Sequence, residues 1–60
     1  MSYCRTLNSQ QVLNVLEDEA NRASQGGDMS LYYEAREECV RRGFDPDDVL
    51  RERGVKKPGK

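Results

Sequence analysis

The segment from residue 39 to residue 55 encodes the end of one helix, a tight turn and the start of another helix, and it constrains the fold more than any other segment. Gly43 can adopt the left-handed backbone conformation that ends a helix, because glycine has no Cβ. Asp45 is a favoured N-cap for the next helix, and Pro46 suits its first position, where no N–H is needed. Phe44 is spaced to contact an apolar residue in each helix. The segment therefore predicts a helical corner.

Two more helices are predicted before this corner, over residues 9–24 and 29–42, and the helix after it covers residues 46–53. Asn8 can cap the first helix and form a capping box with Gln11, three residues further on. Apolar residues repeat along this helix with the spacing of one helical face. They are Val12, Leu13, Leu16, Ala20 and Ala23.

These elements predict an all-α fold, a small three-helix domain over residues 1–55. We expect the first two helices to form an antiparallel hairpin and the short third helix to cross one end. The second helix starts with Asp28 or Ser30 as its cap. Residues 1–7 show no periodicity and predict an extended or frayed arm. Residues 56–60 predict a disordered basic tail.

The second helix carries two apolar stripes rather than one. The first stripe contains Leu31, Tyr32, Ala35 and Cys39. The second stripe contains Tyr33 and Val40, about 100° further round the helix. Because a middle helix packs against two neighbours, the second stripe is consistent with contact to the third helix. It is also consistent with a contact surface for another chain, and the sequence leaves both open.

The 60-residue chain has a net charge of −1, but its charges are segregated. Residues 1–50 contain five Lys or Arg and ten Asp or Glu, whereas residues 51–60 contain five Lys or Arg and one Glu. At this length a folded chain buries only about 60% of the surface that its unfolded form exposes, which leaves its stability marginal. Self-association or a partner would add stability, and no catalytic cavity of ordinary size fits inside.

The composition also argues against an enzyme. The chain contains no histidine, the side chain that most often acts as a base near neutral pH. Its carboxylates fall on predicted caps and exposed faces, where nothing would raise their pKa. The acidic segment 45–48 lacks the twelve-residue calcium-binding pattern, and two cysteines alone cannot hold zinc. We therefore expect no catalytic site, no cofactor, no metal ion and no small-molecule substrate.

Cys4 and Cys39 leave three states open. Free thiols with Cys39 buried are favoured, ahead of an intramolecular bridge and then an intermolecular one. No apolar run is long enough for a signal peptide or a membrane span, so we expect no membrane contact. We therefore expect a cytoplasmic location, where free thiols persist.

What remains is a small non-enzymatic protein–protein interaction module, acting as an adaptor, regulator or inhibitor of a larger protein or by self-association. The predicted contact residues lie on the second helix and are Tyr32, Tyr33, Arg36 and Val40. Tyrosine and arginine are enriched at protein interfaces. Small accessory and phage-encoded regulators are often of this size, which is an association and not a physical argument.

The alternative is weak nucleic-acid binding, because a helix, a glycine-containing turn and a short helix have the outline of a helix-turn-helix motif. The cations available for phosphate contacts are Arg51, Arg53, Lys56, Lys57 and Lys60. Asp47 and Asp48 lie in the first turn of the third helix and would repel the phosphates that a recognition helix approaches. We therefore rank nucleic-acid binding second.

Overall fold

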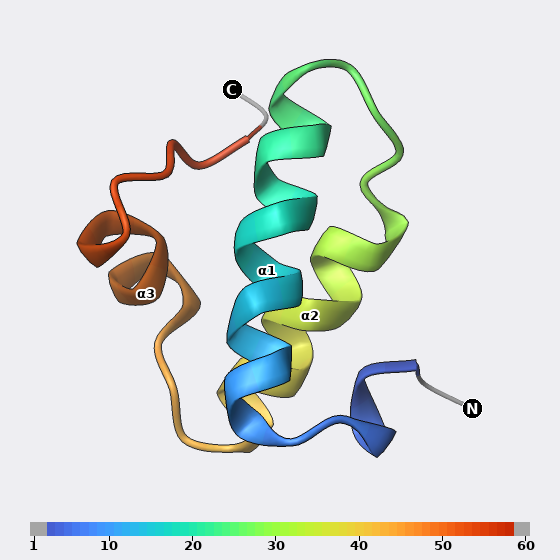
Figure 1. The fold of residues 1–60 in the computed structure, drawn as a ribbon, viewed down its shortest axis with the longest axis vertical. Helices are drawn as coiled ribbons and strands as arrows, with labels where there is room; N and C mark the ends of the chain where they lie inside the picture. Colours follow the sequence, from blue (N-terminus) through green and yellow to red (C-terminus); the bar gives the residue numbers. More distant parts are fainter. Residues whose placement is uncertain (1–2, 59–60) are drawn as a thin grey trace.

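A computed structural model describes residues 3–58, in which one short 3-10 helix is followed by three α-helices (Figure 1). The 3-10 helix η1 spans Tyr3–Thr6, and the α-helices α1, α2 and α3 span Ser9–Ser24, Ser30–Arg41 and Pro46–Glu52. Helices α1 and α2 run antiparallel and pack along each other. Helix α3 contacts both of them from one side, and η1 contacts α2 from the other side.

The predicted all-α three-helix fold is confirmed, and the helix boundaries agree to within one residue. Helix α1 has the predicted bounds, whereas α2 begins at residue 30 instead of 29 and ends at residue 41 instead of 42. Helix α3 ends at residue 52 instead of 53. The expectation of an extended or frayed N-terminal arm is wrong for residues 3–6, which form η1, and residues 1–2 lie outside the described part of the chain.

Side-chain caps fix the starts of the helices. The capping box of α1 is confirmed, because the Gln11 N–H donates to Asn8 Oδ1 at 2.9 Å and the Asn8 N–H donates to Gln11 Oε1 at 3.0 Å. Neither predicted residue is the N-cap of α2, where Met29 occupies that position. Asp28 still contributes there, since its Oδ1 accepts from the N–H of Ser30 at 3.0 Å and from its hydroxyl at 2.9 Å.

The predicted corner between α2 and α3 is present. Gly43 has a φ of +91°, in the left-handed region. The Phe44 N–H donates to the carbonyl of Cys39 at 2.8 Å, and the Gly43 N–H donates to the carbonyl of Val40 at 3.0 Å. This pair of bonds is the Schellman pattern, which satisfies carbonyls at a helix end. Asp45 then caps α3 by accepting from the backbone at Asp47.

Replacing Gly43 by alanine is expected to lower the free energy of unfolding by about 1–2 kcal/mol, because a Cβ is strained in the left-handed region. The space around Gly43 is open, with nothing within 4 Å of the position that a Cβ would take, so backbone strain is the only cost. Gly43→Asn is the control, since asparagine tolerates this conformation and should cost less. Urea unfolding of the three proteins measures the difference, and an alanine variant as stable as the wild type would contradict the left-handed corner.

The core draws on η1 and on all three helices. Its buried residues are Cys4, Val12, Leu16, Ala20, Tyr32, Ala35, Cys39 and Leu50. Phe44 and Val49 pack against this cluster from the corner and from α3, as the corner pattern predicts. Val15 also packs against the cluster. The core therefore holds α2 firmly between its neighbours and leaves one side of it uncovered.

The basic tail follows α3 without further helix as far as the structure describes it. Pro58 is buried, and Lys57 Nζ lies 3.6 Å from Asp47 Oδ2 in α3. These contacts hold part of the segment against the domain. The disorder expected for residues 56–60 stays a prediction, with residues 59–60 outside the described part of the chain.

Candidate functional site on the outer face of helix α2

The side of α2 that points away from the core presents two large apolar side chains. Tyr33 is 55% exposed and Val40 is 63% exposed, and they lie two turns apart on the same face. Glu37 lies between them and is also exposed. Arg36 and Arg41 lie at the two edges of this strip. We call the strip formed by these five residues the outer face of α2.

The outer face is uncovered because the neighbours of α2 stop at its edges. On one edge, Arg36 Nη1 donates to Asp47 Oδ1 in α3 at 2.8 Å. On the other side, the backbone N–H of Cys4 in η1 donates to Glu34 Oε2 at 3.0 Å. Helix α3 therefore does not cover the second apolar stripe of α2. Contact with the third helix was one of the two explanations that the sequence left open for this stripe, and it does not account for the stripe.

Tyr32 does not belong to this surface, contrary to the sequence-based prediction. Its side chain is 2% exposed and lies in the core, because residues 32 and 33 point about 100° apart on a helix. Its hydroxyl accepts from Arg36 Nη1 at 3.3 Å, and its ring centroid lies 5.5 Å from that of Tyr33. Tyr32 thus lies beneath the outer face, in contact with Tyr33, and is not accessible to another protein.

Arg36 is held in place rather than free to move. Its guanidinium donates to Asp47 and to the Tyr32 hydroxyl, and its Cζ lies 5.7 Å from the centre of the Tyr32 ring. The hydrogen bond from Arg36 lowers the pKa of Asp47 below its ordinary value, with a smaller contribution from the charge of Lys57. The Arg36 side chain is still 28% exposed, so one edge of the outer face carries a positive charge in a fixed position.

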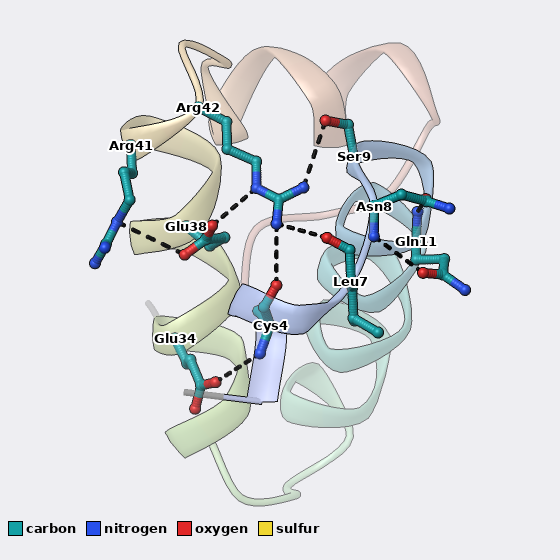
Figure 2. A network of polar contacts seen from close by, with 9 residues as sticks. All are labelled: Cys4, Leu7, Asn8, Ser9, Gln11, Glu34, Glu38, Arg41 and Arg42. Atoms are coloured by element: carbon teal, nitrogen blue, oxygen red, sulfur yellow. Dashed lines mark hydrogen bonds and ion pairs between the residues drawn. The ribbon is translucent and has the colours of Figure 1, made fainter. Parts of the chain in front are cut away.

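Arg42 joins the C-terminal end of α2 to the start of the chain (Figure 2). Its Nη2 donates to the carbonyl of Leu7 at 2.6 Å and to that of Cys4 at 3.2 Å, and its Nη1 approaches Ser9 Oγ at 3.4 Å. Its Nε donates to Glu38 Oε2 at 2.8 Å. Arg42 thus forms a local ion pair with Glu38 four residues earlier, and its other contacts join α2 to η1 and α1.

Glu38 corrects the expectation that every carboxylate lies on an exposed face or a cap. It is 5% exposed, and its two oxygens face Arg42 Nε at 2.8 Å and Arg41 Nε at 3.7 Å (Figure 2). A buried carboxylate needs such partners, because loss of hydration is costly for an ion. Glu19 is buried as well, at 8% exposure. Neither burial was visible in the sequence.

Cys4 and Cys39 are both buried and both free, which agrees with the favoured sequence-based prediction. Burial raises the pKa of both thiols above the ordinary value, and for Cys4 the nearby carboxylate of Glu34 adds to this effect. A thiol with a raised pKa is a poor nucleophile near neutral pH, because only the thiolate reacts. The two cysteines therefore act as core residues in this structure.

The stability of the protein is expected to fall as the pH rises above about 8.5, the ordinary thiol pKa. Because the pKa values of Cys4 and Cys39 are higher in the folded state, the unfolded chain loses these protons first. The contribution is complete below the unfolded pKa and is lost as the pH rises toward the folded values. Urea unfolding near pH 8 and about pH 9.5 measures the slope. An equal slope in the double variant Cys4→Ala, Cys39→Ala would contradict this origin.

Most cations proposed for phosphate contacts already face carboxylates. Arg53 Nη1 lies 2.7 Å from Glu17 Oε1, Arg51 pairs with Asp48, and Lys57 lies near Asp47. Lys56 is exposed, and Lys60 lies outside the described residues. Binding a nucleic acid here would require breaking internal ion pairs and bringing the acidic first turn of α3 to a polyanion. This arrangement disfavours the alternative of nucleic-acid binding.

In residues 3–58, no three His, Cys, Asp or Glu side chains gather in a way that could hold a metal ion. None of the helices in this range is long and apolar enough to cross a membrane. No protein-family model matches the chain, and neither the curated proteins nor the solved structures contain a match. The inference of a function therefore depends on the chain's own residues.

Proposed function

We propose that this protein is a non-enzymatic protein–protein interaction module that binds through the outer face of α2. The observation that supports this proposal is the exposure of Tyr33 and Val40, two turns apart, on a helix whose opposite side is buried in the core. Arg36 adds a charged edge to the same face. The contact residues are thus Tyr33, Arg36 and Val40, without Tyr32.

The chemistry of the outer face suits association. A tyrosine supplies a large contact area with few rotatable bonds, and tyrosine and arginine often carry much of the binding energy at interfaces. Single exposed apolar residues are normal on protein surfaces, but here two of them share one stripe of one helix. Covering both would remove apolar surface that the folded monomer leaves in water.

The scaffold below the outer face is fixed before binding. Tyr32 and Cys39 anchor α2 in the core, and Arg42 joins its last turn to η1 and α1. A partner would therefore meet a formed helix, and little ordering entropy would oppose binding. The described residues form a single small domain, so an adaptor or inhibitor function would use a surface of this one domain.

Affinity capture from the cells that produce the protein tests this function, with bound proteins identified by mass spectrometry. Tyr33→Ala and Val40→Asp are expected to lose the specific partners, because each removes apolar contact area from the outer face. Asn21→Asp is the matched control, an added charge at an exposed position of α1. Partner sets that are the same for wild type, Tyr33→Ala and Val40→Asp would contradict the proposal.

A further inference from the structure

The two cysteines of the chain come from different elements and lie in one core. Cys4 belongs to η1, and Cys39 belongs to the C-terminal half of α2. Both side chains are fully buried, and both belong to the cluster that η1 and the three helices form. Because η1 packs on α2, two segments far apart in the sequence each bring one thiol to the same interior.

Two hydrogen bonds fix the position of Cys4 along α2 (Figure 2). The Cys4 N–H donates to Glu34 Oε2 at 3.0 Å, and the Cys4 carbonyl accepts from Arg42 Nη2 at 3.2 Å. Residues 34 and 42 lie about two turns apart on one side of the helix, with Glu38 midway between them. The backbone of Cys4 is therefore level with the turn of α2 that contains Glu38 and Cys39.

The direction of the Cys39 side chain brings the two thiols together. Cys39 points about 100° away from Glu38, from the side of α2 that bonds to η1 toward the core. The electrostatics agree with this placement. Burial and the charge of Glu34 raise the pKa of the Cys4 thiol, and the charges of Glu38 and Cys39 raise this pKa further. Such effects weaken with distance, so Cys39 lies close to Cys4.

We propose that Cys4 and Cys39 form a reversible disulfide by exchange with a low-molecular-weight disulfide such as oxidised glutathione. In the first step the Cys4 thiolate attacks the small disulfide, which forms a mixed disulfide and releases one small thiol. Cys39 then attacks the Cys4 sulfur, so that the internal bridge forms and the second small thiol leaves. The two protein thiols are oxidised, their protons pass to the two released thiols, and one small disulfide is reduced.

Opening of η1 gives the small disulfide access to Cys4. In the closed structure both thiols are buried and have raised pKa values, so neither reacts readily. The element η1 is only four residues long, and side chains of α2 hold it through the backbone of Cys4. A short segment held in this way opens locally at a smaller cost than global unfolding. Its freedom also lets Cys4 reach the Cα separation of about 4.4–6.8 Å that a disulfide requires.

The bridge fastens η1 to the buried side of α2 and leaves the outer face unchanged, so this inference goes beyond the proposed function. It closes a loop of about 35 residues, which restricts the unfolded chain. The bridged protein is therefore expected to melt at least about 5 °C above the reduced protein. Oxidising conditions thus stabilise the fold that presents the outer face, and reducing conditions remove this extra stability.

Equilibration of the full chain with reduced and oxidised glutathione at about pH 8 tests the bridge. After an acid quench, mass spectrometry is expected to find a monomer that has lost two hydrogen atoms and has no thiol left to alkylate. Dithiothreitol should restore both thiols. A wild type that stays reduced in excess oxidised glutathione, stops at mixed disulfides or links two chains would overturn the proposal.

Single variants test the stabilising effect of the bridge. Cys4→Ala and Cys39→Ala cannot form it, so oxidised glutathione should not raise their melting temperatures, and circular dichroism confirms that each is folded. A similar rise in either variant would contradict the bridge as the cause of the stabilisation. A bridged wild type that melts at or below the temperature of the reduced protein would show that the bridge does not fit the fold, and would overturn the proposal.

Alkylation of the reduced wild type tests the role of η1 opening. Iodoacetamide is expected to modify Cys4 at least about threefold faster than Cys39, because opening of η1 removes Cys4 from the core while α2 stays in place. Peptide mapping over a time course measures the two rates. Equal rates, or faster modification of Cys39, would overturn η1 opening as the route to the bridge.

Discussion

Replacing Tyr32 by alanine is expected to lower the free energy of unfolding by about 3–5 kcal/mol, the range found when a large buried aromatic side chain is truncated. Tyr32 is 2% exposed and is the largest of the fully buried side chains. Its loss leaves a cavity between α2 and the other core residues and removes the acceptor for Arg36. A 60-residue domain typically has only about 3–9 kcal/mol of stability, so this loss removes about a third of the stability or more.

The neighbouring tyrosine provides the matched control. Tyr33→Ala removes the same atoms from a side chain that is 55% exposed, and its expected cost is within about 0.5 kcal/mol. Tyr32→Phe keeps the ring and removes only the hydroxyl. It should lower the free energy of unfolding by about 0.5–1.5 kcal/mol, because the hydrogen bond from Arg36 is lost. Thermal and urea unfolding of the three variants measure these values. Similar losses for Tyr32→Ala and Tyr33→Ala would contradict the assignment of one tyrosine to the core and one to the surface.

Replacing Arg42 by alanine is expected to cost about 2–4 kcal/mol of stability. The substitution removes the donor to the carbonyls of Cys4 and Leu7 and leaves the carboxylate of Glu38 buried without its closest partner. Breaking a buried ion pair by removing one member typically costs about 3–5 kcal/mol. The Arg42 side chain is 19% exposed, so we place the expected cost below the top of that range.

Arg41 is the matched control for this experiment, since it is adjacent in sequence and also faces Glu38. Its side chain is 56% exposed and its Nε is 3.7 Å from Glu38 Oε1, so Arg41→Ala should cost no more than about 0.5 kcal/mol. Arg42→Lys keeps the charge but loses the planar fork of N–H donors. Its stability cost should lie between those of Arg41→Ala and Arg42→Ala. Amide hydrogen exchange should show η1 opening first in Arg42→Ala. An Arg41→Ala variant that loses as much stability would contradict the larger structural role of Arg42.

The sequence predicted the helices and the corner because their signals are local. The capping box joins Asn8 to a residue three positions away, and the Schellman bonds at Gly43 join residues within one turn. Such contacts depend on the spacing of residue types and need no knowledge of the tertiary fold. The start of α2 was predicted less accurately. Asp28 and Ser30 form a hydrogen bond with each other, and Met29 occupies the N-cap position.

The site was predicted less completely because its boundaries depend on contacts between distant residues. Arg42 bonds to Cys4 and Leu7, which are 38 and 35 residues earlier in the chain. Glu38 lies four residues before Arg42, a spacing that is visible in the sequence, whereas the carbonyls that Arg42 also binds are not. The same limit applied to Tyr32 and Tyr33, since which of them is buried depends on where α1 and α3 pack against α2.

Binding of other protein chains through the outer face of α2 is best tested by photo-crosslinking from two positions in the producing cells. A benzophenone side chain in place of Val40 would lie on the outer face, and one in place of Asn21 would lie on the exposed side of α1. We predict crosslinked protein adducts from position 40 and none from position 21. Adducts from position 21 with none from position 40 would contradict binding through this face.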